Sequence, residues 1–459
     1  MIYYDITDII NHSRFSTKVS GIQRVVLEGL KGLDGENTIF FISPITGKTY
    51  EVNGLGQIDL NDLSPFINLW IYADLYISKS EENIDKYFQK IRGLGRKKKA
   101  VSDAYFLFSK IPSVRKISHK VIIKYLKNRI SLYPGLKVTE FSNFKEEASV
   151  ALFGGVWNFQ SQYQELFNSK LHSLRKIFMV YDMIPIVSPY VPDELKQMFK
   201  EYIPFVLEYA DKIVVNSQSC RNDLSNYCVK RGVTLPDIDV VHLSHKLPDT
   251  SKERDVETKA EMDFEYPLRV RKLKNEQYAF CVGSIESRKN HVNLLLTWIK
   301  FFNSSEYANQ KLVIAGKWLW DTDAFANQLS STGNVYGSVI IMQDASDAEI
   351  GELYRNCRFT VYPSHYEGWG LPLGESLALG KPCLHFDNSS LKEAGYGMTI
   401  AVEYPNYKKY YQEFSKLMSD DSYLNEKVNL IESNKSKLRS WKDFSTDIKK
   451  IFIHEEEIQ

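Results

Sequence analysis

The amino-acid sequence predicts an α/β protein in which two doubly wound domains face each other across a cleft. A chain of 459 residues is too long for one hydrophobic core, so at least two domains are expected. Short apolar runs alternate with helical stretches in both halves, which is typical of parallel sheets covered by helices. A polar, charge-rich stretch from Pro248 to about Asn275 separates the halves and is interpreted as a linker.

The first half contains several short apolar runs bounded by polar residues or glycine, and each is predicted to be a strand. These runs are Ile39–Ile42, Leu69–Tyr72, Val150–Phe153, Ile177–Val180 and Lys212–Val215. Two longer stretches are predicted helices: Ile22–Leu33 before the first of these runs and Asp193–Ala210 between the last two.

The second half repeats the alternation of strands and helices. The predicted strands are Tyr278–Gly283, Lys311–Gly316, Val339–Met342 and Phe359–Tyr362. One helix is predicted at Val292–Phe302, and another is expected to start at Ser376–Leu379. Ligands of such sheets bind outside the carboxyl ends of the strands, so a functional site is expected in the loops that follow the strands.

Composition and charge argue against several classes of protein. A net charge of +1 gives no overall attraction to nucleic acid, which is not expected as a partner. No run of about 18 apolar residues occurs, so no transmembrane helix is expected, and Met1–Asp5 does not resemble a signal peptide. The five cysteines form no CxxC pair, so we expect reduced thiols of a cytosolic protein and no metal site.

One basic segment departs from the average composition. Lys90–Arg129 contains thirteen Lys or Arg and one acidic residue, Asp103, which gives 13 − 1 = +12 in a chain of net charge +1. Apolar residues recur within it at helical spacing, from Ile111 to Tyr125. Such a basic amphipathic helix is typical of docking on an anionic membrane surface. A solvated helix packed on its own domain and a nucleic-acid contact are the alternatives.

The strongest signal for chemistry is the loop that follows the predicted strand Phe359–Tyr362. Glycines at a strand-to-helix turn let the backbone approach a ligand and point amide groups at it. Glu367 lies in this loop, and Glu375 lies in the helix that follows, where an inward carboxylate can accept hydrogen bonds from a vicinal diol. Amides for phosphate and carboxylates for hydroxyls together suit a nucleotide sugar. The alternative is a glycine turn between two core elements.

A second loop supplies positive charge. Gly283 ends a predicted strand, and Arg288 and Lys289 follow it at the entrance of a predicted helix. Two adjacent cations beside the positive end of a helix dipole can bind a pyrophosphate. They can also stabilise charge that develops on a leaving phosphate. An ordinary charged surface loop is the alternative.

These two segments, GSIESRKNH and SHYEGWGLPLGES, resemble the signature segments of retaining glycosyltransferases of family 4, which have the GT-B fold of two Rossmann-like domains. Glu367 and Glu375 occupy the two positions of the family's E-x7-E pattern. LYRNCRFTVYPS before the pattern and LKEAGYG after it are also similar to family segments. In the first half, YYDITDII, SGIQRVV, MVYDMIPIVSP and IVVNSQSCRNDL resemble a subgroup that builds bacterial O-antigen and capsular polysaccharides, and SWKDFSTDI resembles the final helix.

This resemblance implies a division of the chain into parts. Residues 1–265 are expected to form the acceptor-side domain, with a basic insertion at about 79–139. Residues 266–438 are expected to form the nucleotide-sugar-binding domain. Residues 439–459 are expected to form a helix that crosses back to the first domain.

The resemblance also implies roles for individual residues. Arg288 and Lys289 bind the diphosphate of the donor, Glu367 contacts the transferred sugar, and Glu375 binds the ribose hydroxyls. Further donor contacts are expected from Gly21, Gly283, Trp369, Gly370 and Leu371. Tyr181 stands where many relatives have a histidine, so a histidine-dependent role is in question, and Asp182 is expected on the acceptor side.

The activity implied is hexose transfer with retention of configuration, without metal or cofactor, by front-face attack. GDP-mannose is the first expectation for the donor, followed by dTDP-rhamnose or a UDP-hexose. The expected acceptor is a lipid-linked oligosaccharide at the inner face of the cell membrane, reached by a cytoplasmic, peripherally bound protein. An epimerase or hydrolase of nucleotide sugars and a non-catalytic glycan- or lipid-binding protein are the alternatives.

Overall fold

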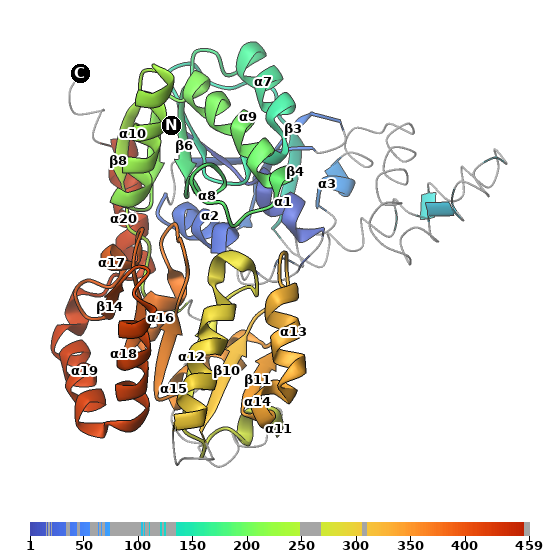
Figure 1. Cartoon of the computed structure of the whole chain (residues 1–459). Helices are drawn as coiled ribbons and strands as arrows, with labels where there is room; N and C mark the ends of the chain where they lie inside the picture. The colour runs from blue at the N-terminus through green and yellow to red at the C-terminus, as the bar shows by residue number, and fades with distance from the viewer. Residues whose placement is uncertain are drawn as a thin grey trace. The chain divides into compact units, whose positions relative to one another are not determined.

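The structure is a computed structural model (Figure 1). It describes residues 1–14, 16, 19, 21–33, 37–43, 46–55, 63, 66, 69–73, 102, 103, 105, 110, 120, 121, 124, 135–247, 268–304 and 310–453. The basic segment lies outside the described residues, apart from isolated positions, and so do residues 248–267 of the predicted linker. Contacts divide the chain into two compact units. Unit 1 comprises residues 1–179, 202–213 and 448–459, and unit 2 comprises residues 180–201 and 214–447.

The first sheet has eight strands in the order β4-β3-β2-β1-β5-β6-β7-β8. Strand β1 pairs in parallel with β2 and β5, and β5 pairs in parallel with β6, whereas β3 and β4 extend the edge in antiparallel pairing. The strands are β1 Ile2–Asp5, β2 Asn37–Ile42, β3 Thr49–Asn53, β4 Lys137–Glu140, β5 Ser149–Leu152, β6 Arg175–Val180, β7 Lys212–Val215 and β8 Asp237–Val240.

Helices connect these strands, and their apolar sides are buried. In helix α2, for example, Val25, Val26, Leu27 and Leu30 are all buried. The helices of this half are α1 Thr7–Ser13, α2 Gly21–Lys31, α3 Leu69–Tyr72, the 3-10 turn η4 Val156–Asn158, α7 Gln160–Ser169, α8 Ile184–Val187, α9 Asp193–Tyr209 and α10 Gln218–Arg231.

The second sheet has six parallel strands in the order β11-β10-β9-β12-β13-β14, all in unit 2. The chain therefore builds outward from β9 in one direction and then returns to continue from β12 in the other, which is the doubly wound arrangement. The strands are β9 Tyr278–Val282, β10 Lys311–Ala315, β11 Val339–Met342, β12 Phe359–Tyr362, β13 Cys383–Asp387 and β14 Ile400–Glu403.

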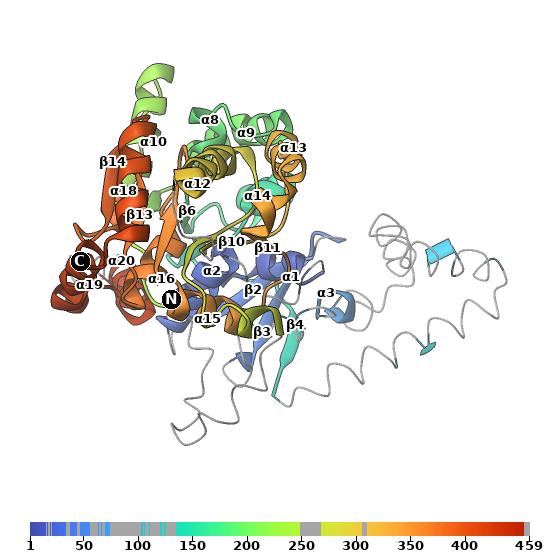
Figure 2. The same cartoon turned by 60° about the horizontal axis from the view of Figure 1, so that its bottom comes forward.

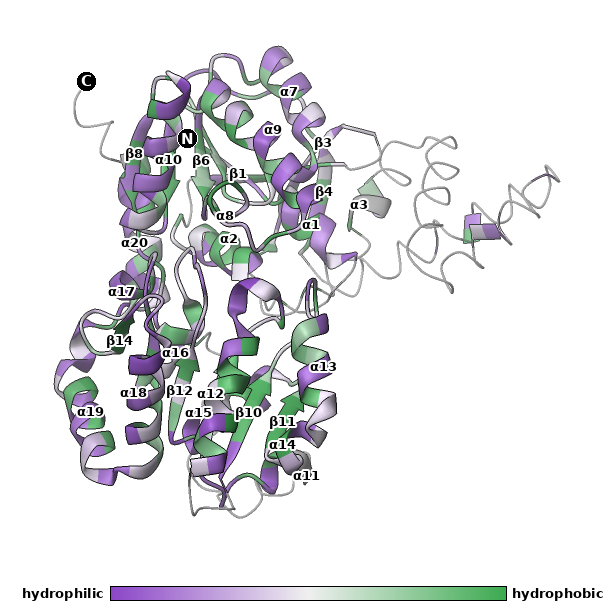
Figure 3. Cartoon of the chain, in the orientation of Figure 1, coloured by the Kyte–Doolittle hydropathy of each residue, from purple (hydrophilic) through white to green (hydrophobic). Residues whose placement is uncertain are grey.

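Helices cover both faces of this second sheet. Successive residues of a strand point to opposite faces, so Ala279 and Cys281 join one hydrophobic cluster while Tyr278 and Phe280 join the other. Helices α12 (His291–Ser304) and α18 (Tyr407–Ser419) pack on the first face, and α15 (Asp347–Asn356) packs on the second. Figure 2 shows α12 and α15 on either side of β10. In Figure 3 strands β10 and β11 are mainly hydrophobic, as expected for strands that helices cover on both faces. Helix α19 (Asp421–Asn434), in contrast, carries many hydrophilic residues.

Helices and 3-10 turns make up the other elements of the second half. They are α11 Leu268–Arg271, the 3-10 turn η6 Ser287–Lys289, α12 His291–Ser304, α13 Asp323–Ser331, α14 Gly333–Gly337, α15 Asp347–Asn356, α16 Leu371–Ala378, α17 Leu391–Ala394, α18 Tyr407–Ser419, α19 Asp421–Asn434, the 3-10 turn η7 Lys435–Lys437 and α20 Trp441–Ile453.

The last helix returns to the first unit. Helix α20 begins in unit 2, but its residues from Ile448 onward belong to unit 1, where the ring of Phe452 lies 6.4 Å from the ring of Phe153. This return confirms the expected end of the fold. Within the described ranges, no helix is long and apolar enough to cross a membrane. The boundaries placed at residues 265 and 438 stay predictions.

The structure confirms the predicted α/β class and most predicted elements, and it corrects three. Leu69–Tyr72 is helix α3 and not a strand, because a run of four apolar residues does not distinguish the two. The interpretation of residues 268–275 as linker is wrong, since this stretch contains helix α11 and buries Val270 and Leu273. Helix α16 begins at Leu371, earlier than the expected Ser376, because Gly370 already supplies its N-terminal cap position.

One glycine in the second sheet permits a close approach between two strand ends. A Cβ atom at Gly316, just after β10, would lie 1.8 Å from the carbonyl oxygen of Gly283. We expect Gly316→Ala to lower the free energy of unfolding by about 1–3 kcal/mol, because the backbone has to move apart. Thermal unfolding followed by circular dichroism measures the change.

Gly351→Ala is the matched control for this prediction. Gly351 lies inside helix α15, where an added Cβ meets only the flexible side chain of Arg355 at 3.7 Å. This variant is expected to gain about 0.5–1 kcal/mol from helix propensity. Equal midpoints for the two variants would contradict the close approach at Gly316.

Candidate functional site

The candidate site lies where the direction of strand order reverses in the second sheet. Strands β9 and β12 are neighbours there, although about 80 residues separate them in the sequence. The loops 283–290 and 363–370 leave the carboxyl ends of these two strands. Doubly wound sheets bind ligands at this switch point. The fold therefore brings together the two loops that the sequence selected.

Hydrogen bonds between the two loops fix them side by side. Asn290 adopts a left-handed conformation with φ of 61°, ends the turn η6, and donates from Nδ2 to the carbonyl oxygen of Pro363 at 3.0 Å. The amide of His365 donates to the carbonyl oxygen of Arg288 at 2.9 Å. The backbone around Arg288 is therefore attached directly to the loop that carries Glu367.

A buried group of four charged side chains, which we call the charge cluster, forms at this junction. It consists of Glu286, Arg288, Lys289 and Glu367. Glu367 pairs with Arg288 at 2.9 Å and with Lys289 at 2.6 Å, and Arg288 also pairs with Glu286 at 2.6 Å. None of the four side chains is more than 12% exposed. Two positive and two negative charges balance, which offsets the cost of burial.

Burial and pairing act in opposite directions on the pKa values of the charge cluster. Burial alone would raise the pKa of Glu367, but Arg288 and Lys289 outweigh it and lower this pKa to about 2. Burial lowers the pKa of Lys289, with Glu367 opposing the shift. Burial would also lower the pKa of Arg288, but Glu367 and Glu286 outweigh it and raise this pKa. Glu367 and Arg288 are therefore charged at neutral pH.

Tyr362 completes the surroundings of Lys289. The hydroxyl of this last residue of β12 accepts a hydrogen bond from Lys289 Nζ at 2.8 Å, and the same ammonium lies 4.7 Å from the centre of the ring. A hydroxyl and the negative face of a ring both favour a cation. Lys289 is thereby held at the carboxyl end of β12.

Glu375 lies in helix α16, which begins directly after the glycine loop. Gly370 caps the helix with φ of 103°, a conformation that favours glycine, and a Cβ there would also lie 2.6 Å from Leu391. Glu375 is 8% exposed and accepts a hydrogen bond from the hydroxyl of Tyr354 at 3.1 Å. Trp369, before the cap, is buried, and its ring lies 4.8 Å from that of His242.

The predicted acceptor-side residues adjoin the glycine loop. A Cβ at Gly368 would lie 2.8 Å from the carbonyl oxygen of Tyr181 and 2.9 Å from Asp182 Cβ, so glycine permits this contact. Asp182 Oδ1 accepts a hydrogen bond from the amide of Ile184 at 2.9 Å, which closes the loop before α8. Burial raises the pKa of Asp182, while Arg288 lowers it.

The structure thus brings most predicted site residues into one region of unit 2. Gly283, whose φ is 147°, directly follows β9, and a Cβ there would lie 3.5 Å from the side chain of Lys289. Leu371 is the first residue of α16. Gly21 is the first residue of α2 and belongs to unit 1. The roles assigned to all these residues stay predictions.

Several residues at this region were not selected from the sequence. Glu286 lies inside one selected motif, and Tyr362 lies just before the other. In the structure they accept hydrogen bonds from Arg288 and Lys289. Their polar groups close to these two cations in the motifs were the signal in the sequence that could have identified them. Glu393 accepts hydrogen bonds from the amides of Gln218 and Ser219, at 2.7 and 2.8 Å, at the N-terminus of α10. No local pattern in the sequence indicates a bond that joins residues so far apart.

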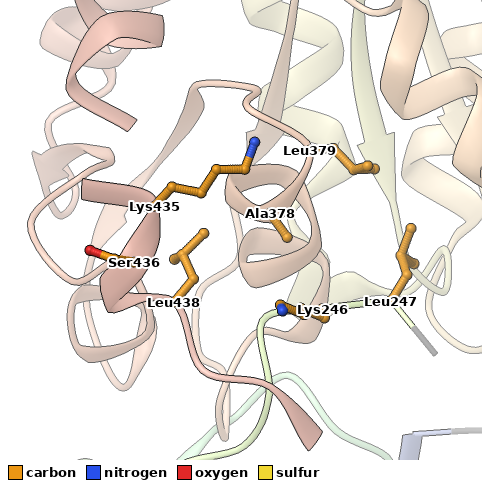
Figure 4. A pocket seen from close by; sticks show the side chains of 7 residues that line it. All are labelled: Lys246, Leu247, Ala378, Leu379, Lys435, Ser436 and Leu438. Atoms are coloured by element: carbon orange, nitrogen blue, oxygen red, sulfur yellow. The ribbon is translucent and has the colours of Figure 1, made fainter. Parts of the chain in front are cut away.

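A separate pocket of about 540 Å³ lies at the other end of α16 (Figure 4). It is lined by Lys246, Leu247, Ala378, Leu379, Lys435, Ser436 and Leu438, and not by the predicted site residues. No group of three or more His, Cys, Asp or Glu side chains suited to a metal ion occurs within the described parts of the chain. Metal independence stays a prediction.

Comparisons with known proteins place this region in a sequence family. Residues 265–437 match the family described as "Glycosyl transferases group 1". This match confirms the predicted resemblance to glycosyltransferases over these residues.

Two curated relatives from Escherichia coli are similar to parts of the chain. The "Serotype-specific mannosyltransferase WbdA" is 24% identical over 217 residues, which are 47% of this chain and 26% of that protein. The "O-antigen chain mannosyltransferase B" is 32% identical over 116 residues, which are 25% of this chain and 30% of that protein. The chain thus matches less than a third of the length of each relative.

Solved structures share the fold at low sequence identity. An alpha,alpha-trehalose-phosphate synthase (UDP-forming) from Burkholderia xenovorans aligns with a TM-score of 0.51 at 10% identity, over 72% of this chain and 75% of that one. An alpha,alpha-trehalose 6-phosphate synthase from Burkholderia multivorans aligns with a TM-score of 0.50 at 10% identity, over 69% of this chain and 73% of that one. The predicted GT-B fold of two Rossmann-like domains is confirmed.

The lowered pKa of Glu367 predicts a pH dependence of stability. A carboxylate whose pKa falls from 4.5 to about 2 on folding stabilises the folded state above pH 4.5, and this contribution disappears as the pH falls to 2. A shift of this size corresponds to roughly 3 kcal/mol. We expect Glu367→Gln to be less stable than the wild type at pH 6, by a margin that shrinks toward pH 2. Urea unfolding at each pH measures it.

Glu432→Gln is the control for this pH series. Glu432 pairs with Lys435 at 3.0 Å, but both side chains are about half exposed, so the pair contributes little. Its stability difference from the wild type is expected to stay near zero throughout. A margin for Glu367→Gln that stays constant from pH 6 to pH 2 would contradict the lowered pKa.

Proposed function

We propose that this chain, which carries a glycosyl transferases group 1 domain in residues 265–437, transfers a hexose from a nucleotide sugar to a glycan acceptor. The observation that carries this proposal is the charge cluster at the switch point of the second sheet, inside the matched residues. Two buried cations suit a diphosphate, and two buried carboxylates, Glu367 and Glu375, suit sugar and ribose hydroxyls.

GDP-mannose is the proposed donor, with dTDP-rhamnose and UDP-hexoses as further candidates. Support comes from the names of two relatives, both of which are mannosyltransferases. Glu375, which is held by Tyr354 inside helix α16, is proposed to bind the ribose hydroxyls. Backbone amides of Trp369, Gly370 and Leu371 at the start of α16 are proposed to face the sugar and the diphosphate.

Arg288 and Lys289 are proposed to bind the diphosphate in exchange for Glu367. In the structure both cations are occupied by the oxygen atoms of Glu367. A diphosphate offers them more negative charge than one carboxylate. The released carboxylate of Glu367 can then accept hydrogen bonds from the hydroxyls of the transferred sugar. Donor binding thus releases Glu367, while Arg288 and Lys289 stay in their existing positions.

The proposed reaction retains the configuration of the transferred sugar and uses no metal ion. The bond between the anomeric carbon and the diphosphate oxygen breaks, and a bond to the acceptor oxygen forms on the same face. The acceptor proton moves to the departing diphosphate. Arg288 and Lys289 stabilise the negative charge that develops on this group, an effect for which one donor typically contributes about 3 kcal/mol.

The proposed acceptor is a lipid-linked oligosaccharide of bacterial surface polysaccharide synthesis. The name of one relative, an O-antigen chain mannosyltransferase, supports this class of acceptor. Tyr181 and Asp182, which adjoin Gly368, are proposed to contact the acceptor. Because such an acceptor resides in a membrane, we also propose that the chain binds its cytoplasmic face through Lys90–Arg129.

The proposed activity is tested by incubating the full chain with GDP-mannose, dTDP-rhamnose or a UDP-hexose and an oligomannoside acceptor. The product from GDP-mannose is expected to be α-linked, as seen by NMR, and to form equally well with EDTA. Lys289→Ala is expected to lower kcat about a hundredfold, as for other losses of one electrostatic donor.

Lys409→Ala is the control for this variant. Lys409 also pairs with a glutamate, Glu413, at 2.7 Å, but it is half exposed on helix α18. The Lys409→Ala variant is expected to have the same kcat as the wild type. Sugar release without transfer would indicate a hydrolase. Full activity of Lys289→Ala would show that the diphosphate does not bind at the charge cluster. Loss of activity with EDTA would disprove the metal-free mechanism.

Membrane binding is tested with vesicles that contain anionic lipid. The +12 charge of Lys90–Arg129 is expected to give binding that weakens as salt rises, because the Debye length is about 8 Å at physiological salt and shorter above it. Reversal of Arg96, Lys97, Lys98 and Lys99 to glutamate should weaken binding further. Vesicles of neutral lipid are the control. Equal binding of wild type and variant would show that the segment does not dock on the membrane.

A further inference from the structure

Three partly exposed aromatic side chains lie together beside the charge cluster. They are Tyr190, His365 and Tyr404, and we call them the aromatic rim. The rings of Tyr190 and His365 stack with centres 4.0 Å apart and planes at 10°. The ring of Tyr404 stands edge-on to His365 at 5.7 Å, and its hydroxyl shares a hydrogen bond of 3.0 Å with His365 Nδ1.

The aromatic rim is attached to both loops of the candidate site. Ser287, next to Arg288, donates from its hydroxyl to the carbonyl oxygen of Tyr190 at 3.4 Å. The amide of His365 donates to the carbonyl oxygen of Arg288 at 2.9 Å, and His365 precedes Glu367 by two positions. A molecule that reaches the charge cluster therefore lies next to the rim.

Exposure distinguishes the rim from the aromatic residues that fill the interior around the site. Tyr354, Tyr362 and Trp369 are at most 4% exposed and fill the interior. The three side chains of the rim are each partly exposed. Burial lowers the pKa of His365 to about 4, so its imidazole is neutral at pH 7. The rim thus offers uncharged ring surfaces with polar groups at their edges.

A pyranose has the complementary chemistry. Its C–H groups form an apolar face that packs on an aromatic ring, and its hydroxyls point outward, where ring nitrogens and phenol groups can bond them. A phosphate has no such face and would favour cations instead. The ligand class that fits the rim is therefore a neutral sugar ring.

We propose that the aromatic rim is a subsite that stacks against a hexose ring of the glycan acceptor, with Tyr190 as its main contact. This inference rests on the proposed function, because it assigns the donor to the charge cluster and α16. Tyr190 lies on the segment that follows β6, together with Tyr181 and Asp182 beside Gly368. The rim therefore extends the acceptor side away from the reacting hydroxyl.

Binding of an α-mannotetraose, measured by calorimetry without donor, tests the subsite. Tyr190→Ala is expected to weaken this binding roughly fivefold, in line with the value of aromatic packing contacts. Tyr190→Phe keeps the ring and is expected to bind within about twofold of the wild type, on the same scale. Tyr336→Ala removes a tyrosine that is 84% exposed and stacks on Phe302 of α12, and it should bind as the wild type does.

Kinetics and GDP binding separate this subsite from the proposed function. Tyr190→Ala should raise KM for the tetraose and leave both kcat and the affinity for GDP unchanged. Tetraose binding that is unchanged in Tyr190→Ala, or lost equally in Tyr190→Phe, overturns the subsite, and so does a wild type that does not bind the tetraose. A wild type that binds it through Tyr190 but transfers no mannose overturns the proposed function alone.

Discussion

The carboxylate of Glu367 is the group on which the arrangement of the candidate site depends. It joins Arg288 from the loop after β9 to Lys289 at the entrance of α12, and its own loop follows β12. Without it, two buried cations would stand next to each other, and Glu286 would remain paired with Arg288. Removing one partner from a buried ion pair typically costs about 3–5 kcal/mol. The two loops and the charge cluster are therefore parts of one structure.

Buried charge of this kind is a poor way to gain stability but an effective way to prepare a site. The desolvation of four charged groups consumes most of what their mutual attraction supplies. Their positions are fixed in advance by Asn290, Tyr362 and the backbone of His365. A ligand that takes over Arg288 and Lys289 then does not have to order them. Pre-ordered groups are what electrostatic catalysis requires.

The elements that the sequence predicted well are those whose identity is local. Three strands lie at the residues predicted for them: Lys212–Val215, Val339–Met342 and Phe359–Tyr362. A short apolar run between polar residues is typical of a buried strand. Leu69–Tyr72 has the same pattern and is a helix, since four residues do not reveal a period. Packing with the rest of the unit decides such a segment.

The candidate site divides in the same way. Arg288, Lys289, Glu367 and Glu375 stood out because glycine and charge concentrate near them in the sequence. Hydrogen bonds between residues that are far apart in the sequence give no local pattern of this kind. Tyr366 donates to Asp223, and Ser217 donates to the carbonyl oxygen of Gly368 at 3.0 Å. In the sequence, nothing near Tyr366 or Ser217 indicates its partner, which is known only from the fold.

The composition of unit 1 has a consequence for folding during synthesis. This unit is assembled from residues 1–179, 202–213 and 448–459, so its parts leave the ribosome at widely separated times. The surface around Phe153 remains uncovered until Phe452 has been made, after the whole of unit 2. Domains usually fold in order from the N-terminus. Here the second unit can finish its sheet first, and the last turns of α20 complete the first unit only after all of unit 2 has been made.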